Sequence, residues 1–237
     1  MDFESGDLSQ WPGRKLPRPD SARVVTTPVR AGRYAAEFVL RRSDSVVSDG
    51  KRAELVVDGI GEVGGEYWYG FSTMIPGDWR PDTKAGEVVA QWKGRPDSDL
   101  GESSDRSPSL ALRVKGEKWR ITVQTDPSPV TRDNGAPRRT VWQGKFTRDA
   151  WDDWVFHVRW SCRRDGLLQI WKNGKRIASW RGPNAYNDKG KMYLKIGIYK
   201  PGWNDPAAPS DVDTRRIFHD EVRIGGAKAD YAAVSPP

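Results

Sequence analysis

The stretch at positions 87–93 reads EVVAQWK and has the two-residue period of a β-strand. Side chains alternate between the two faces of a strand. One face would consist of Val88, Ala90 and Trp92, and the other of Val89, Gln91 and Lys93. An apolar face backed by an amide and an amine predicts a strand that buries one side in a core and offers its other side to a polar ligand.

A second stretch repeats this arrangement. In KRAELVV, residues 51–57, the polar side chains Arg52 and Glu54 share one face and the aliphatic side chains share the other. Arg113 alternates with Leu112 and Val114 in the same way. Both stretches predict strands with one buried face and one charged face.

A third stretch, YLKIGIYK at residues 193–200, adds tyrosine to the polar face. Its aliphatic side chains alternate with Tyr193, Lys195, Gly197 and Tyr199. We expect Gly197 to leave a gap at which a ligand approaches the sheet. Together the three stretches predict the floor of a groove for an anionic ligand.

The period of two dominates the rest of the chain, and no convincing long helix pattern is present. Further alternating runs occupy residues 67–72, 110–114, 119–123 and 154–160. Asn173-Gly174 suits the positive φ angles of a type I′ turn and predicts a tight β-hairpin. We therefore expect one all-β domain over residues 1–237, built as two stacked antiparallel sheets in a sandwich or jelly roll. Loops rich in Pro, Ser, Asp and Gly, at 97–108, 125–137 and 201–213, are expected to border the groove.

The composition favours an acidic polysaccharide as the partner. The formal net charge is +7 and the chain contains 12 tryptophans, and indole rings stack on sugar faces while cations attract carboxylates. Nucleic acid would explain the charge, but the chain has no basic tail, zinc-finger spacing or helical recognition motif.

No apolar run approaches the roughly 20 residues of a membrane-spanning helix. The only cysteine, Cys162, excludes an internal disulfide. We expect a monomer that binds neither nucleic acid nor membranes.

The polar strand faces suit β-elimination on a uronic acid chain. An enzyme for this reaction must stabilise the charge that develops on the carboxylate, remove the proton from C5 and protonate the departing O4. Arg52 and Gln91 suit the first task. Tyr199, made more acidic by Lys195 and Lys93, suits the two proton transfers.

The same strands resemble motifs of a known family. The stretches that carry the resemblance are KRAEL (51–55), EYWYGFS (66–72), VAQW (89–92), GPNAYND (182–188) and YLKIGIYK (193–200). They are similar to motifs of the jelly-roll polysaccharide lyases of the heparin lyase I and glucuronan lyase type and, more distantly, of alginate lyases. The resemblance implies a concanavalin-like β-jelly roll with a concave substrate groove.

The resemblance also implies roles for individual residues. Arg52 and Gln91 would hold the substrate carboxylate, and Tyr199 would be the catalytic tyrosine. The residues expected to bind substrate around them are Glu54, Arg113, Tyr193, Lys195 and Lys200. Those lyases usually have a histidine where this chain has Lys93. Because a lysine has a reference pKa of about 10.4, we expect Lys93 to act as an electrostatic clamp rather than as a base.

The missing histidine favours one class of substrate. In D-glucuronate and D-mannuronate units linked through O4, H5 and O4 lie on the same face, so a single tyrosine can take one proton and deliver it to the other atom. In L-guluronate and L-iduronate units the two atoms lie on opposite faces, and a second group is needed. Glucuronan or another D-glucuronate-type chain is therefore favoured.

Two alternatives remain at this point. One is a non-catalytic carbohydrate-binding protein of the same fold, in which the missing histidine marks lost activity. The other is a jelly-roll glycoside hydrolase, which would need two carboxylates close together on a strand. No E-x-D-x-E strand is present, and Asp220 and Glu221 are adjacent and so lie on opposite faces.

The remaining candidates are structural. His157 and His219 are expected to be satisfied structural histidines. Glu4 and Asp220 could meet at a structural calcium ion, as the termini do in related jelly rolls. No cofactor is required for the chemistry. The expected function implies a secreted or periplasmic protein, although no leader precedes Asp2 in this chain.

Overall fold

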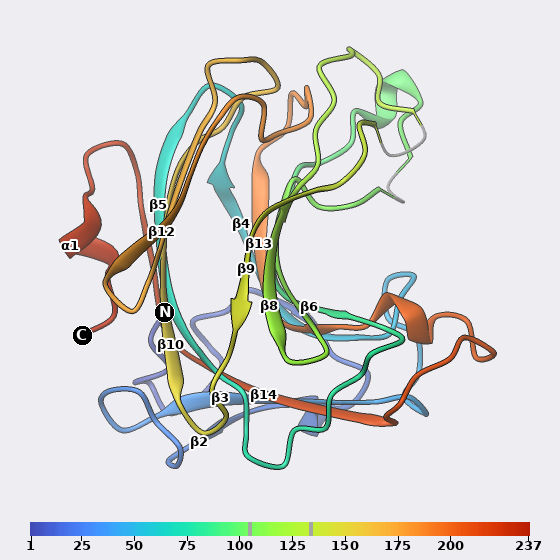
Figure 1. The fold of residues 1–237 in the computed structure, drawn as a ribbon, viewed down its shortest axis with the longest axis vertical. Coiled ribbons are helices and arrows are strands. Elements are labelled where there is room, and N and C mark those ends of the chain that lie inside the picture. Colours follow the sequence, from blue (N-terminus) through green and yellow to red (C-terminus); the bar gives the residue numbers. More distant parts are fainter. Residues whose placement is uncertain (104–105, 133–134) are drawn as a thin grey trace.

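Two antiparallel sheets of seven strands each make up the protein (Figure 1). The computed structural model describes residues 1–103, 106–132 and 135–237. The predicted all-β jelly roll with two stacked antiparallel sheets is confirmed. No helix in these described ranges is long and apolar enough to cross a membrane.

One sheet, called here the groove sheet, carries all three stretches with polar faces. Its strands in spatial order are β1 (Gly13–Lys15), β4 (Arg52–Gly61), β13 (Met192–Tyr199), β6 (Glu87–Lys93), β7 (Leu110–Lys115), β8 (Lys118–Val123) and β9 (Arg139–Lys145). Strand β13 pairs with β4 on one side and with β6 on the other. The three predicted strands are therefore direct neighbours, and their polar faces form one surface.

The other sheet, called here the outer sheet, packs behind the groove sheet. Its strands in spatial order are β12 (Lys175–Arg181), β11 (Leu167–Lys172), β10 (Trp151–Arg159), β5 (Glu66–Met74), β14 (Thr214–Gly225), β3 (Ala35–Arg41) and β2 (Ala22–Val25). The single turn of α-helix, α1 (Tyr231–Val234), packs against β14, β5 and β10. Three short 3₁₀ helices span Pro19–Ser21, Ser98–Leu100 and Pro201–Trp203.

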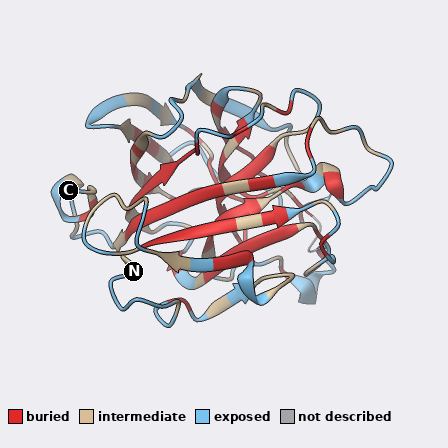
Figure 2. Ribbon diagram, turned by 90° about the horizontal axis from the view of Figure 1, so that it is seen from below, coloured by how far each residue is buried: buried red, intermediate tan, exposed pale blue. Residues whose placement is uncertain are grey.

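The core between the sheets is rich in aromatic side chains. The ring centroids of Trp92 on the groove sheet and Phe156 on the outer sheet lie 4.8 Å apart, and buried residues run along the strands of both sheets (Figure 2). The buried tryptophans are Trp11, Trp79, Trp92, Trp119, Trp154, Trp160 and Trp203. More than half of the 12 tryptophans therefore stabilise the fold instead of meeting a ligand.

Strand β6 departs from strict alternation. Its pairing with β7 shifts register between Val88 and Ala90, which marks a β-bulge. Val88 consequently lines the groove cavity, while Val89 joins the hydrophobic core. The predicted faces of these two valines were wrong, because one extra residue reverses the alternation N-terminal to the bulge. The predicted faces of Gln91 and Lys93 stand, since both line the cavity.

Strand β13 is irregular at the same level of the sheet. Gly197 has a φ of +124°, and a Cβ atom there would collide with the carbonyl oxygen of Ala53 and lie 2.8 Å from the ring of Phe38 on β3. The prediction that Gly197 leaves a gap in the groove was therefore wrong. Glycine is needed because the backbone conformation and the close approach of the outer sheet exclude a side chain.

His219 of β14 lies behind both irregularities. Its ring is fully buried, meets Phe38 edge-on at 5.5 Å, and faces the backbone of Gly197 and Val89. Burial lowers the pKa of His219 to about 3, so the ring is neutral near pH 7. The buried position agrees with the predicted structural role of His219, but the prediction that its ring is satisfied is not confirmed, because neither ring nitrogen makes a hydrogen bond of normal geometry within the described residues.

The hairpin between β11 and β12 is confirmed. Asn173 and Gly174 both have positive φ angles, as a type I′ turn requires. His157 on β10 is also structural, as predicted: Nε2 lies 2.6 Å from Glu66 Oε1, Nδ1 lies 3.0 Å from Gln169 Oε1, and the ring stacks on Trp68 at 4.0 Å.

Candidate active site

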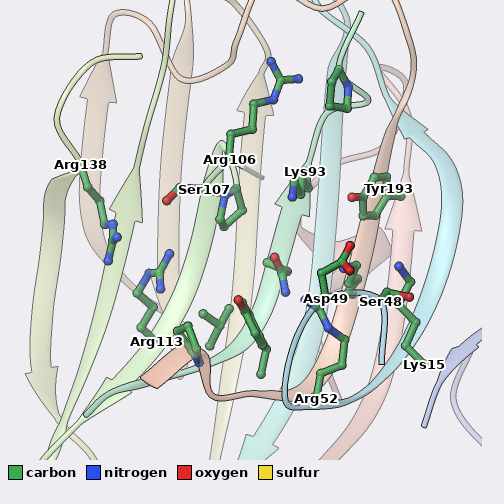
Figure 3. A pocket seen from close by; sticks show the side chains of 17 residues that line it. Lys15, Ser48, Asp49, Arg52, Lys93, Arg106, Ser107, Arg113, Arg138 and Tyr193 are labelled. Carbon is green, nitrogen blue, oxygen red and sulfur yellow. The ribbon is translucent and has the colours of Figure 1, made fainter. Parts of the chain in front are cut away.

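A cavity of about 420 Å³ lies on the exposed face of the groove sheet (Figure 3). Its floor is formed by β4, β13, β6 and β7, and loops close its sides. The predicted residues that it brings together are Arg52, Gln91, Lys93, Arg113, Tyr193, Lys195 and Tyr199. Ser48, Asp49, Arg106 and Arg138 also line the cavity, and the sequence did not point to them individually.

The cavity carries a large excess of positive charge. Among the described residues, the lysines and arginines that line it are Lys15, Arg52, Lys93, Arg106, Arg113, Arg138 and Lys195, and the one acidic residue is Asp49. No tryptophan is among the lining residues, and the aromatic side chains there are Tyr193 and Tyr199. The surface therefore suits an anionic ligand through charge, while the expected stacking of indole rings on sugars does not occur in this cavity.

Glu54 organises the centre of the floor from beneath. Its side chain is 2% exposed and does not line the cavity. Arg52 Nη1 donates to Glu54 Oε2 at 3.1 Å, Gln91 Nε2 donates to Oε1, and Lys195 Nζ lies 3.6 Å from Oε2. The prediction that Glu54 binds substrate was wrong, because its oxygens are already engaged and its charge would repel a carboxylate. Glu54 instead fixes the side chains that present positive and amide groups to the cavity.

Lys195 combines burial with a charged environment. Burial lowers the pKa of Lys195 to about 8 even though Glu54 favours its protonated form, and Arg52 and Lys15 lower it further. Lys195 therefore loses its proton in a pH range where an ordinary lysine keeps it. Burial raises the pKa of Tyr193 to about 12, so this neighbouring phenol stays neutral near pH 7.

Tyr199 stands at one end of the floor, and its ring is held by two groups. The Arg52 guanidinium lies 4.2 Å from the centre of the ring. Asn204 Nδ2 lies 3.5 Å from the hydroxyl, and the same side chain accepts a hydrogen bond from Lys51 N at 2.8 Å. The cation found on the Tyr199 ring is Arg52, whereas Lys195, predicted as a neighbour, lies over the ring of Tyr193.

Asn204 was missed from the sequence. It lies just after the 3₁₀ helix Pro201–Trp203, in the loop that was predicted to border the groove. Asn204 Nδ2 also donates to the carbonyl oxygen of Asp49 at 3.3 Å, which ties the loop that carries Ser48 and Asp49 to the tyrosine. The only available signal was its position in a groove-bordering loop.

Lys200 does not reach the cavity. It is fully buried, and its Nζ lies 2.8 Å from Asp82 Oδ2 and 3.0 Å from Glu87 Oε2. Glu87 also contacts Arg215, with 2.5 Å between Oε1 and Nε. The prediction that Lys200 binds substrate was wrong, because the residue after Tyr199 points to the interior face of the strand. It anchors the start of the loop that holds Asn204.

Arg106 forms part of one side wall. Its guanidinium is buried between Glu102, at 3.1 Å, and Asp188, at 2.6 Å, and lies 4.4 Å from the ring centre of Tyr186. Tyr186 and Asp188 belong to the GPNAYND motif. In this structure the motif therefore supports the wall through Arg106.

Glu4 and Asp220, the predicted calcium ligands, both contact the segment 30–34. Asp220 Oδ2 accepts hydrogen bonds from Arg30 N at 2.8 Å and Ala31 N at 3.4 Å. Glu4 accepts from Arg33 N and from Tyr34 N at 3.0 Å. Each carboxylate thus caps backbone groups of the segment 30–34, and the shared calcium site stays a prediction. Within the described ranges, no group of three or more His, Cys, Asp or Glu side chains could hold a metal ion.

Comparisons with known proteins agree with this geometry. The model of the family described as polysaccharide lyase matches residues 3–223. The structure is similar to an endo-β-1,4-glucuronan lyase from the fungus Trichoderma reesei, with 21% identity, a TM-score of 0.78, and coverage of 98% of this chain and 96% of that one. No curated protein matches the sequence significantly.

More distant solved structures share the fold. An alginate lyase from Pseudomonas aeruginosa is 16% identical, with a TM-score of 0.57 and coverage of 93% of this chain and 99% of that one. The catalytic domain of a glycoside hydrolase family 131 protein from Coprinopsis cinerea is 12% identical, with a TM-score of 0.61 and coverage of 99% and 95%. The fold by itself thus occurs with two kinds of chemistry. The family match over residues 3–223 decides between them: the chain belongs to the polysaccharide lyase family, and it is therefore a lyase that acts on polysaccharides.

Proposed function

We propose that the protein cleaves a D-glucuronate-type polysaccharide, glucuronan being favoured, by β-elimination. The observation that carries this proposal is the alignment of Arg52, Gln91 and Tyr199 on three adjacent strands, on the floor of a cavity with a strong excess of positive charge. The fold shared with an endo-β-1,4-glucuronan lyase supports the choice of polymer.

In the first part of the reaction the enzyme stabilises the carboxylate of the uronate. Arg52 and Gln91, both held by Glu54, present a guanidinium and an amide to the cavity. Lys93 and Lys195 add positive charge on the same floor. As the C5–H bond weakens, negative charge spreads onto the carboxylate, and these groups stabilise it.

In the second part Tyr199 transfers one proton. Its phenolate oxygen takes H5, the C5 electron pair forms the double bond to C4, and the bond between C4 and O4 breaks. The proton then passes from the tyrosine hydroxyl to O4. Because H5 and O4 lie on one face of D-glucuronate, a single group serves both steps, and neither histidine of the chain lines the cavity. Arg52 lies over the ring and helps to hold it in place.

The test is a screen for the ultraviolet absorbance of the unsaturated product. The polymers are glucuronan, alginate blocks, hyaluronan, heparin, heparan sulfate and xanthan, each incubated with and without a chelator. We expect the fastest cleavage of glucuronan and no effect of the chelator. Faster cleavage of polyguluronate than of glucuronan would contradict the single-tyrosine mechanism.

We also propose that the protein acts as a secreted or periplasmic enzyme, a proposal that its membership of the polysaccharide lyase family supports. Fractionation of the source cells, with an antibody to the protein, tests this. Detection in the cytoplasmic fraction only would contradict it.

A further inference from the structure

A second cavity, of about 560 Å³, continues the groove toward β8 and β9. It shares Arg113, Arg138 and Pro201 with the active-site cavity. Figure 3 shows Arg113 and Arg138 together on the side of the groove away from Tyr193 and Lys15. A polymer that crosses the strands at Tyr199 would therefore meet this second cavity next.

Three arginines gather where the two cavities join. Arg113 on β7 and Arg120 on β8 are direct cross-strand partners, so their side chains leave the same face of the sheet. Arg138, just before β9, is close enough to lower the pKa of Arg113, after the larger effect of burial. Like charges placed directly opposite each other on neighbouring strands destabilise a sheet.

Within the part of the chain that the structure describes, no acidic side chain offsets this charge. Across the described residues, neither Asp nor Glu forms an ion pair with Arg113, Arg120 or Arg138. Arg113 Nε donates to the Thr122 hydroxyl at 3.0 Å, and the buried Nε of Arg120 has no hydrogen-bond partner. Glu87 borders the second cavity, but its carboxylate is engaged with Lys200 and Arg215.

Other buried arginines of the protein are paired. Arg106 contacts Glu102 and Asp188, and Arg215 contacts Glu87. Among the described residues, by contrast, Arg113, Arg120 and Arg138 have no carboxylate partner. Arg113 and Arg120 are partly buried and Arg138 is exposed. Unpaired charge that is partly buried is unfavourable unless a ligand supplies the counter-charge.

We infer that Arg113, Arg120 and Arg138 form a second anion subsite, which begins at the border of the active-site cavity and binds an oxyanion substituent of a sugar next along the polymer from the sugar at Tyr199. The inference rests on the proposed function, because it assumes that an anionic polymer lies across the groove sheet. Strands β7 and β8 are two and three strands from β13, and strands lie about 4.8 Å apart, so the subsite is roughly 10–15 Å from Tyr199. The oxyanion is a uronate carboxylate or a sulfate ester, since guanidinium groups bind both.

The test uses Arg120→Gln and Arg138→Gln in the full chain. The matched control is Arg176→Gln, which removes the same charge from an exposed position on β12 of the outer sheet. Steady-state cleavage is measured on glucuronan polymer and on oligosaccharides too short to reach from Tyr199 to β8. We expect KM for the polymer to rise about tenfold in both variants with little change in kcat, and KM for short substrates to stay within twofold. The melting temperature of Arg120→Gln should equal or exceed that of the parent, because repulsion is relieved.

Binding is measured separately from cleavage. Calorimetry in a Tyr199→Phe background compares glucuronan, a sulfated polysaccharide and a neutral β-1,4-glucan. Weaker binding of the polyanions in Arg120→Gln and Arg138→Gln supports the subsite, even if the parent cleaves no polymer and the proposed function fails. A loss confined to the sulfated polymer identifies a sulfate ester as the ligand, and a loss confined to glucuronan identifies a carboxylate.

Three results would overturn the subsite. The first is unchanged polymer binding in Arg138→Gln. Because Arg138 is exposed, this variant should fold normally. The second is an equal rise in KM for short and long substrates. The third is equal weakening of the binding of the neutral glucan.

Discussion

Two charged clusters lie along strand β13, and they differ in how their charges are balanced. The buried network under the end of the strand consists of Asp82, Glu87, Lys200 and Arg215, two anions and two cations, all within the interior. The groove cluster consists of Arg52, Glu54, Gln91 and Lys195, in which one anion faces two cations, and further cations surround it. The buried network is balanced in charge and structural, whereas the groove cluster has an excess of positive charge that suits an anionic ligand.

The largest expected difference between the groove and the buried network is an effect on catalysis at Tyr199. We expect Tyr199→Phe to lower kcat by about 10²–10⁴-fold, because the proton transfers lose their hydroxyl group. Binding of glucuronan should remain within threefold of the parent. The control, Tyr193→Phe, should retain most of kcat. If Tyr193→Phe lost as much kcat as Tyr199→Phe, the assignment of the proton transfers to Tyr199 would be contradicted.

Loss of one charge from the buried network should lower the free energy of unfolding. Lys200→Met leaves Asp82 and Glu87 without one of their two cations, which should lower the free energy of unfolding by about 3–5 kcal/mol. Chemical denaturation measures this effect. The control is Lys191→Met, an exposed lysine just before β13, which should change stability by less than about 0.5 kcal/mol. Equal stability of the two variants would refute the distinction between the clusters.

Glu54 tests the groove cluster without touching the substrate. Glu54→Gln should lower kcat/KM by about tenfold, because Arg52, Gln91 and Lys195 lose the carboxylate that orients them. The exposed Glu62→Gln should leave kcat/KM unchanged. If Glu54→Gln instead tightened substrate binding with full kcat, Glu54 would be only a repulsive charge.

The smallest expected effect is a pH dependence from Lys195. Its pKa of about 8 means that it is protonated below pH 8 and loses its positive charge as the pH rises through that value. KM for an anionic substrate should therefore rise severalfold between pH 7 and pH 9. Lys195→Arg, which keeps its charge, should shift this rise to higher pH. A KM that is independent of pH in the parent would exclude Lys195 from substrate binding.

The same lysine adds a stability effect of opposite sign. The folded-state pKa of Lys195 is depressed from 10.5 to about 8, so between these values the unfolded chain binds more protons than the folded chain. This group therefore makes the protein more stable as the pH rises from about 8 to about 10.5. Denaturation curves across that range, with Lys195→Met as the control, measure the contribution.

Alternation in the sequence was enough to predict the strands and most of the groove floor. It placed Arg52, Gln91, Lys93 and Tyr199 on one surface, because the strands that carry them are neighbours in the sheet. Strict alternation also assigns Lys200 to the face opposite Tyr199, which the structure shows to be the interior. The prediction for Lys200 followed the YLKIGIYK motif, which indicated a substrate-binding residue, although the strand period placed this lysine on the interior face.

Other features could not be read from one sequence. The period of a strand shows which face a residue occupies but not how deep it lies, so Glu54 was predicted at the surface of the groove although it lies beneath. Asn204 and Arg106 come from loops, whose conformation depends on tertiary contacts. The β-bulge at Val88 depends on pairing with two neighbouring strands and has no mark of its own in the sequence.

That β-bulge has a consequence for how the site can change by insertion or deletion. Because the strand period is two, losing one residue from a regular strand turns every later side chain to the wrong face. In β6 the extra residue is already present, so deletion of Val89 would restore regular pairing and leave Val88 and Gln91, then two positions apart, on the same face. A homologue with a strand one residue shorter here would therefore keep both the apolar side chain at the position of Val88 and the amide at the position of Gln91 on the groove face. Alignments of related lyases across this strand should place their gaps at Val89 and not beside Gln91.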